Sequence, residues 1–222
     1  MNHLFFLIAR TLRREDVLQT LSQPPEQAAA RFRGARVALV GNARSLAQSD
    51  HGAAIDGADL VIRINRAPMP SAQSHGTRTD VLALATSISD ADMARIGPGA
   101  VWWLSHKRKR LPWSVARRPG FFMPGLGLFD GLRANLGAPP TTGLMLIDWL
   151  SRTDAAEVQL FGFDFFASLS LSGRRSADQV PHDFGGERGF VMALAARDSR
   201  FRLIAPGAGD DAAADRGAQA PQ

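Results

Sequence analysis

The chain of 222 residues contains no cysteine. It therefore forms neither a disulfide bond nor a thiolate metal site, which is typical of proteins of a reducing compartment. We expect a cytoplasmic location on this ground.

The sequence also has no long hydrophobic run. The apolar stretch within HLFFLIARTLRR (3–14) is far shorter than the roughly 20 residues that span a bilayer, and no small-residue cleavage site follows it. We therefore expect neither a transmembrane helix nor a secretory signal. The segment suits either an interfacial helix or a helix that docks on the core, and we favour docking on the core.

The glycine patterns of two common nucleotide folds are missing as well. An apolar strand, VALV (37–40), runs into Gly41 and Asn42, and the next glycine is Gly52. A dinucleotide site needs G-x-G-x-x-G at this point, and a P-loop needs G-x-x-x-x-G-K followed by Ser or Thr. The strand resembles the start of a nucleotide-binding fold, but neither of these two kinds of site is present.

Positive charge is in excess. Lys and Arg number 26 against 21 Asp and Glu, which gives a net charge of +5 and a pI near 11.0. Anionic partners are favoured, and nucleic acid, an anionic membrane face and a phosphorylated small molecule all fit this balance. The clearest basic run, His106 to Arg110, is typical of a solvated loop after a strand.

Short apolar runs alternate with helical patterns along most of the chain. Continuous apolar runs of this kind predict buried parallel strands with helices on both faces, which makes the fold class α/β and Rossmann-like. Strands are expected at 37–40, 60–64, 81–85, 100–104, 158–161 and 201–204. Helices are expected at 43–48, 88–96, 128–136, 142–152 and 187–197.

The pattern divides the chain into three parts. Residues 1–33 form an N-terminal helical extension and a connector, whose polar part runs from Ser22 to Arg33. Residues 34–206 form a single domain, a size that supports one core. Residues 207–222 are rich in Ala, Gly, Asp and Gln without apolar periodicity and are expected to be a disordered tail, and residues 166–181 have the composition of a mobile loop.

Polar residues follow several predicted strands. Gly41-Asn42 and Asn65-Arg66 stand at strand ends, and Thr141-Thr142-Gly143 opens a helix. Ligands of open parallel sheets bind beyond the carboxyl ends of the strands, so these residues are candidates for one site. An asparagine can hold a ribose hydroxyl, a base edge or a phosphate oxygen, and a helix start attracts anions. Turn formation and ordinary helix capping are the alternatives.

One histidine is a candidate general base. His182 lies in PHDFGGERGF, with Glu187 five residues later at the start of a helical pattern. Histidine titrates near neutral pH and is therefore suited to taking a proton from a hydroxyl. A structural or exposed histidine is the alternative.

In order along the chain, these pieces resemble the sialyltransferases with sialylmotifs L, S and VS, glycosyltransferase family 29. Motif L is similar to residues 37–68, VALVGNARSLAQSDHGAAIDGADLVIRINRAP, followed by GTRTDVLAL. Motif S is similar to residues 139–166, PPTTGLMLIDWLSRTDAAEVQLFGFDFF, and motif VS, a His and a Glu separated by four residues, to His182 through Glu187.

The resemblance implies a variant GT-A fold and a CMP-activated sugar acid, sialic acid or Kdo, as donor. His182 is then the general base of a single inverting displacement, and Glu187 orients its loop or caps its helix. The resemblance and the strand ends together suggest the donor-binding residues Gly41, Asn42, Ala43, Asn65, Arg66, Thr141, Thr142, Gly143, Gly162 and Phe163.

No metal cofactor is expected. CMP carries a single phosphate, whose charge amide dipoles and side chains can hold without Mg²⁺. The D-x-D pattern at Asp90 to Asp92 falls in a predicted helix and faces no strand end.

The sequence departs from the family in three respects. It has no motif III histidine between Phe166 and Pro181, so Arg174, Arg175 or the run 106–110 is left to balance the phosphate charge. The cysteines and membrane anchor of secreted members are also missing, which indicates a compact bacterial-type enzyme. We expect a glycan or a lipid-linked saccharide as acceptor, with peripheral contact to an anionic membrane at its inner face and no nucleic acid partner.

Two other functions fit parts of the pattern. A nucleotide-sugar-binding protein without catalysis would explain the missing motif III histidine. A basic nucleic-acid-binding module would use Trp102, Trp103 and Trp113 beside the basic run, but the first two lie within an apolar strand and no RNA-recognition pattern is present.

Overall fold

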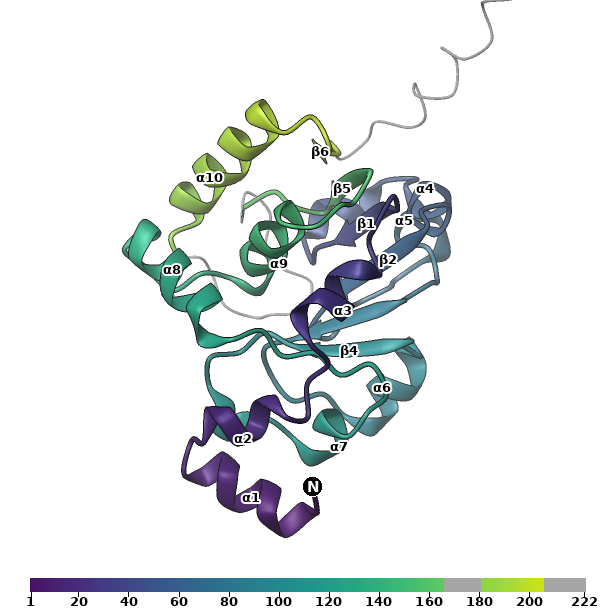
Figure 1. Ribbon diagram of the computed structural model, residues 1–222. Coiled ribbons are helices and arrows are strands. Elements are labelled where there is room, and N and C mark those ends of the chain that lie inside the picture. The colour runs from purple at the N-terminus through teal and green to yellow at the C-terminus, as the bar shows by residue number, and fades with distance from the viewer. Residues whose placement is uncertain (166–180, 206–222) are drawn as a thin grey trace, which may run out of the picture.

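The computed structural model describes residues 1–165 and 181–205 (Figure 1). The predicted mobile loop, apart from Pro181, lies outside these residues, as does the whole predicted tail 207–222.

All six strands of the described part of the chain pair in parallel, so the predicted α/β, Rossmann-like fold is confirmed. Their order in the sheet is β4-β3-β2-β1-β5-β6. The bounds lie within one residue of those predicted: β1 (Arg36–Val40), β2 (Leu60–Ile64), β3 (Val81–Leu84), β4 (Ala100–Trp103), β5 (Glu157–Phe161) and β6 (Phe201–Leu203).

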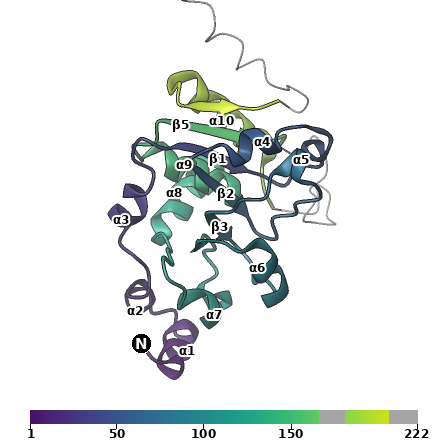
Figure 2. The ribbon, with the colours of Figure 1, turned by 90° about the vertical axis from the view of Figure 1, so that its right-hand side faces the viewer.

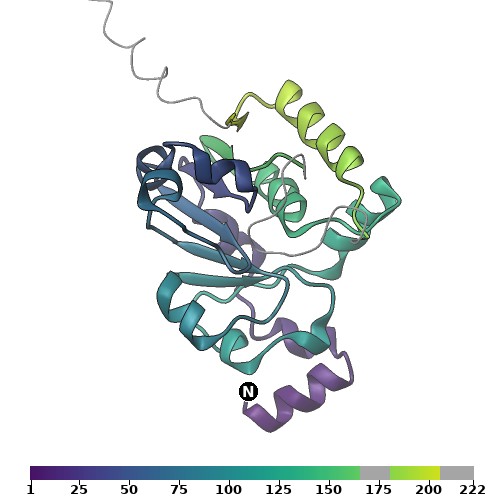
Figure 3. The same cartoon turned by 180° about the vertical axis from the view of Figure 1, so that it is seen from behind.

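Helices cover both faces of the sheet (Figures 2 and 3). Successive strand residues point to opposite faces, so the neighbours Trp102 and Trp103 enter two different clusters. Trp102 packs with residues of α3 (Pro25–Ala30), α8 (Leu126–Leu136), α9 (Thr142–Ser151) and α10 (Phe184–Arg197). Trp103 packs with residues of α1 (His3–Thr11), α2 (Glu15–Gln19), α6 (Asp90–Ile96) and α7 (Trp113–Ala116). This double burial explains why the strands read as continuous apolar runs.

The predicted helices are present, and short ones are added. The segment predicted at 43–48 is a 3-10 helix, η1 (Arg44–Gln48), while α6, α8, α9 and α10 match the other four predictions. Sequence periodicity missed pieces of one or two turns, which are too short to show a repeating apolar face. Besides α2, α3 and α7 they are α4 (Gly52–Asp56), α5 (Ala72–His75) and the 3-10 helix η2 (Arg108–Arg110).

The N-terminal segment is part of the core. The stretch read as a polar connector, 22–33, contains α3, which begins with a proline at its first position and buries Ala28. Phe32 is fully buried edge-on against Trp102 and Trp149. The polar composition of this stretch hid two apolar positions that face the sheet.

One face of α1 also docks on the core, as predicted. Phe6 and Ala9 are buried, and the Arg10 guanidinium donates to the carbonyl of Leu111 at 2.9 Å. Within the described ranges, no helix has the length and apolar character needed to cross a membrane.

The basic run after β4 is not the uniformly solvated loop that its composition predicts. Arg108 is 5% exposed and donates to both carboxylate oxygens of Glu15, with Nη2 to Oε1 at 2.7 Å. The same guanidinium donates to the carbonyls of Ser105 and Pro124. Arg108 therefore joins α2, the end of β4 and the segment before α8, since its planar fork reaches several acceptors at once.

We predict that Glu15→Ala lowers the free energy of unfolding by about 2–3 kcal/mol. The substitution leaves a buried guanidinium without its counter-charge, although partial exposure of Glu15 keeps the loss below that of a fully buried pair. Urea denaturation measures it. Asp16→Ala is the control, because it breaks the exposed pair with Arg14 and should cost almost nothing. Equal losses in the two variants would show that the Glu15–Arg108 pair contributes no more to the free energy of unfolding than the exposed Arg14–Asp16 pair does.

Candidate active site

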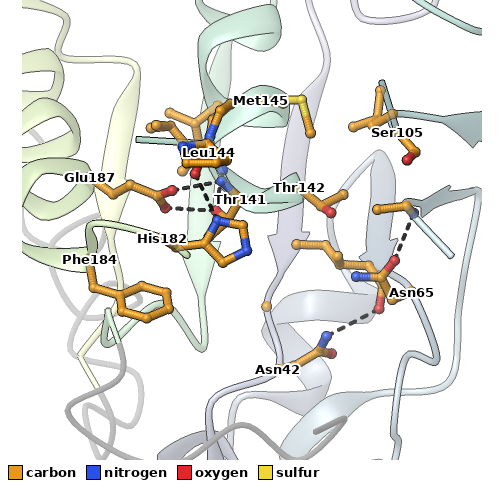
Figure 4. A pocket seen from close by; sticks show the side chains of 18 of the residues that line it. Asn42, Asn65, Ser105, Thr141, Thr142, Leu144, Met145, His182, Phe184 and Glu187 are labelled. Carbon is orange, nitrogen blue, oxygen red and sulfur yellow. Dashed lines mark hydrogen bonds between the residues drawn. The ribbon is translucent and has the colours of Figure 1, made fainter. Parts of the chain in front are cut away.

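A cavity of about 800 Å³ opens at the carboxyl ends of the strands. It lies beside β1, where the order of the strands across the sheet reverses, since β2 flanks β1 on one side and β5 flanks it on the other. Open α/β sheets bind ligands at such a switch point. Residues that follow β1, β2, β3, β4 and β5 all line the cavity, together with the starts of α9 and α10 (Figure 4).

The end of β1 is held tightly against the end of β5. A Cβ on Gly41 would lie 2.4 Å from the carbonyl oxygen of Gly162, and Gly162 itself has a φ of +66°. Any side chain at Gly41 would push these backbones apart, so both glycines are needed for the shape of the cavity floor. Asn42 follows directly and donates from Nδ2 to the carbonyl of Ile64 at 3.3 Å.

The end of β2 turns sharply at Asn65. This residue has a φ of +54°, and its Oδ1 accepts a hydrogen bond from the backbone of Ala85 at 2.8 Å. Asn65 therefore forms the turn and also lines the cavity. Arg66 was predicted at the site but is not among the residues that line it. The turn leaves Arg66 exposed, with its carbonyl accepting from Arg95.

The first turn of α9 lines the cavity. Thr141 is the N-cap, and its hydroxyl accepts from the backbone of Leu144. Gly143 leaves room for the Phe163 ring, because a Cβ at this position would lie 2.7 Å from the ring. Thr142 and Gly143 are buried in the first turn, where the helix dipole favours an anion.

His182 stands beside this helix start. Its Nδ1 lies 2.7 Å from the carbonyl oxygen of Pro139. Because a carbonyl can only accept, Nδ1 carries the hydrogen, so the lone pair of the neutral form of the ring is on Nε2. Figure 4 shows this second nitrogen facing the side of the pocket where Asn42, Asn65 and Thr142 lie. A histidine held in this tautomer is ready to accept a proton.

Glu187 connects α10 to the start of α9. It is 3% exposed and accepts two hydrogen bonds from Thr141, one from the backbone N–H and one from the hydroxyl, each 2.7 Å long. Burial raises the pKa of Glu187 to about 7, against the effect of these two bonds. The alternative that Glu187 caps its own helix was wrong, since Asp183 is the N-cap of α10. Glu187 instead positions the cap residue of α9.

Basic side chains line another part of the cavity. His106, Lys107 and Arg110 come from the segment after β4, and Arg133 comes from α8. The His106 ring stacks on Phe129 with centroids 4.0 Å apart, and burial together with the positive charge of Lys107 lowers its pKa. Arg174 and Arg175, the other candidates for balancing a phosphate, lie outside the described residues.

The cavity gathers most of the predicted site residues and adds others. Sequence reasoning missed Arg133, because it stands in an ordinary amphipathic helix with no local sign of function. The predicted residues that line the cavity are Gly41, Asn42, Ala43, Asn65, Thr141, Thr142, Gly143, Gly162, Phe163, His182 and Glu187; further lining residues include Thr86, Ser105, Met145, Asp164, Phe184 and Val191.

The D-x-D pattern lies away from this cavity. Asp90 to Asp92 form the first turn of α6, where the Ser89 hydroxyl donates to Asp92 and Arg95 pairs with it. None of these residues lines the cavity. Over 1–165 and 181–205, no three His, Asp or Glu side chains come together in a way that could hold a metal ion.

The comparisons with known proteins point to one family. The model of glycosyltransferase family 29 (sialyltransferase) matches residues 4–108, which include the whole motif L segment. The chain resembles this family in both sequence and fold. The match confirms the predicted resemblance and class of enzyme, a sialyltransferase-like glycosyltransferase. It ends before the segments similar to motifs S and VS, and no curated protein sequence matches the chain.

Solved sialyltransferase structures share the fold. A mammalian sialyltransferase is 20% identical over 78% of this chain and 70% of its own, with a TM-score of 0.62. A mammalian sialyltransferase in complex with Gal-beta-1-3GalNAc-ortho-nitrophenol is 19% identical over 86% of this chain and 77% of its own, with a TM-score of 0.61. A variant of the Campylobacter jejuni sialyltransferase CST-II in complex with CMP is 13% identical over 77% of this chain and 81% of its own, with a TM-score of 0.55.

We predict that Glu187 makes the stability of this sialyltransferase-like chain depend on pH. A carboxyl whose pKa rises on folding stabilises the native state below its unfolded pKa of about 4.5, and that stability is lost as the pH rises through about 7. The loss is of the order of 3 kcal/mol. Glu187→Gln imitates the protonated form and should remove this pH dependence.

Urea unfolding of the parent and Glu187→Gln at several pH values between 4.5 and 7.5 measures the difference. The parent should lose stability relative to the variant across this window. Parallel profiles would mean that Glu187 does not titrate there.

Proposed function

We propose that the protein is an inverting, metal-independent glycosyltransferase. It moves a sugar acid, sialic acid or Kdo, from a CMP-activated donor to a saccharide hydroxyl. The observation that carries the proposal is the convergence of Asn42, Asn65 and the amides of α9 in one cavity, with the Nε2 of His182 directed into it.

The chemistry of the cavity suits a nucleoside monophosphate joined to a sugar. Asn42 and Asn65 offer uncharged donors and acceptors for ribose hydroxyls, a base edge or phosphate oxygens. The first turn of α9 offers backbone amides to a single phosphate. Both are held by the fold before a ligand enters, because the strand-end glycines and the Thr141 cap fix their backbones. CMP in the complex of the CST-II relative is consistent with this class of donor.

The proposed reaction is one displacement at the anomeric carbon. The acceptor oxygen attacks from the face opposite to the phosphate, the bond between the anomeric carbon and the phosphate oxygen breaks, and CMP leaves. His182 Nε2 takes the acceptor proton as the new bond forms. The carbonyl of Pro139 holds the ring in the required tautomer and stabilises the charge that appears on the imidazolium.

Catalysis by this site needs no metal ion to hold the departing phosphate. The amides of α9 and the cations Lys107, Arg110 and Arg133 line the same cavity as His182. Fixed dipoles and cations in a partly enclosed site stabilise developing negative charge. We assign the role of the missing motif III histidine to this cationic group.

The acceptor is a glycan or a lipid-linked saccharide, and the cytoplasm is the proposed compartment. The complex of a mammalian relative with Gal-beta-1-3GalNAc-ortho-nitrophenol is consistent with a glycan acceptor. A nucleotide-sugar-binding protein without catalysis is the competing candidate, and it is tested by the same assay. The nucleic-acid module loses its main support, since Trp102 and Trp103 are fully buried and offer no ring to a base.

We predict that His182→Ala lowers the rate of sugar transfer about 10²- to 10⁴-fold, while CMP still binds. The general base is removed but the donor residues stay. Transfer from CMP-sialic acid and from CMP-Kdo is followed as CMP release in the presence of a saccharide acceptor, with CMP affinity measured by calorimetry.

Asn135→Ala is the matched control, because Asn135 is an exposed residue of α8 that does not line the cavity. It should retain full transfer. Parent-like transfer by His182→Ala would exclude His182 as the base, and CMP binding without transfer or donor hydrolysis by the parent would favour the inactive binding protein.

A further inference from the structure

The outer face of α1 carries a stripe of large apolar side chains. Seven large hydrophobic residues are exposed in the described structure, and five of them lie on α1 or at its two ends. Their spacing of three or four residues places them on one side of the helix. The α1 stripe consists of Met1, Leu4, Phe5, Ile8 and Leu12, of which Leu4 is 68% and Leu12 65% exposed.

The opposite side of α1 is fixed to the protein. Phe6 and Ala9 are buried in the core, and Phe6 lies against Trp113 with ring centroids 5.0 Å apart. The helix is closed at its start by the side chain of Asn2, which accepts from the backbone of Phe5. The α1 stripe is therefore presented by a helix that is already folded and docked, at one end of the molecule (Figures 1 and 3).

The segment that carries the α1 stripe is positively charged. Residues 1–14 contain Arg10, Arg13 and Arg14 but no Asp or Glu. The first acidic residues after them already form ion pairs, Glu15 with Arg108 and Asp16 with Arg14. Further exposed cations come from η2, which contacts α1, and from the residue that follows α7. They are Lys109, Arg110 and Arg117, for which the described residues provide no ion pair.

Apolar side chains flanked by cations complement an anionic bilayer surface. The apolar groups enter the boundary between headgroups and acyl chains, and each Lys or Arg near the surface adds attraction to acidic lipids. A second copy of the chain would bring these cations together, so like charges would oppose pairing through this face. The charge therefore favours a membrane over a dimer.

We propose that the α1 stripe, with the cations Lys109 and Arg117, docks the protein on the surface of an anionic membrane. The helix lies in the plane of the interface and does not cross it. This role goes beyond the proposed transfer reaction and is independent of it, because neither the α1 stripe nor Lys109 or Arg117 lines the cavity.

Sedimentation with vesicles of phosphatidylcholine, with and without phosphatidylglycerol, tests the proposal. The full chain should bind the mixed vesicles at least tenfold more tightly than pure phosphatidylcholine. The double substitution Phe5→Ser and Ile8→Ser should weaken this binding at least tenfold, and Lys109→Gln about fivefold. Transfer to a soluble acceptor should be unchanged in both variants.

Matched controls exist at the other end of the molecule. Met192→Ser and Arg197→Gln change an exposed apolar residue and an exposed cation of α10. Both should bind vesicles like the parent, and circular dichroism of every variant checks that it is folded. No preference for phosphatidylglycerol would overturn the proposal. So would a parent dimer in solution that Phe5→Ser and Ile8→Ser convert to monomer without any effect on vesicle binding.

Discussion

The parallel direction of the six strands is the constraint on which the site depends. Because the described strands all run the same way, the residues after β1, β2, β3, β4 and β5 meet at one edge. The close approach of Gly41 and Gly162 then joins the two halves of the sheet at that edge. Asn42 and Asn65 come from different strands and 23 positions apart in the chain, yet they share a cavity for this reason.

A second connection places the base against this floor. Thr141 caps α9 and at the same time donates two hydrogen bonds to Glu187 of α10. His182 is tied to the same segment through the carbonyl of Pro139. The start of α9 and the candidate base are therefore joined through one segment, which suits the proposed displacement, because that reaction needs donor phosphate and acceptor proton in fixed positions.

The sequence was most informative where one local pattern decides the structure. Continuous apolar runs predicted all six strands of the described residues, and the segment Thr141-Thr142-Gly143 was predicted to open a helix. Arg108 and Arg66 were misread because their environments depend on distant partners: Glu15 lies 93 positions from Arg108, and the left-handed turn at Asn65 decides where Arg66 goes. Arg133 was missed for the same reason, since only the packing of α8 against α9 and His106 brings it to the cavity.

The central claim is that the cavity is built for CMP. A thermal-shift comparison of CMP, CDP, UDP and NAD, each with and without EDTA, tests it most directly, because a ligand that binds the native state raises its stability. The account predicts that CMP raises the melting temperature most, that EDTA does not change this, and that Asn42→Ala reduces the rise while Asn135→Ala keeps it. Selective stabilisation by UDP or NAD, or loss of the CMP effect in EDTA, would contradict it.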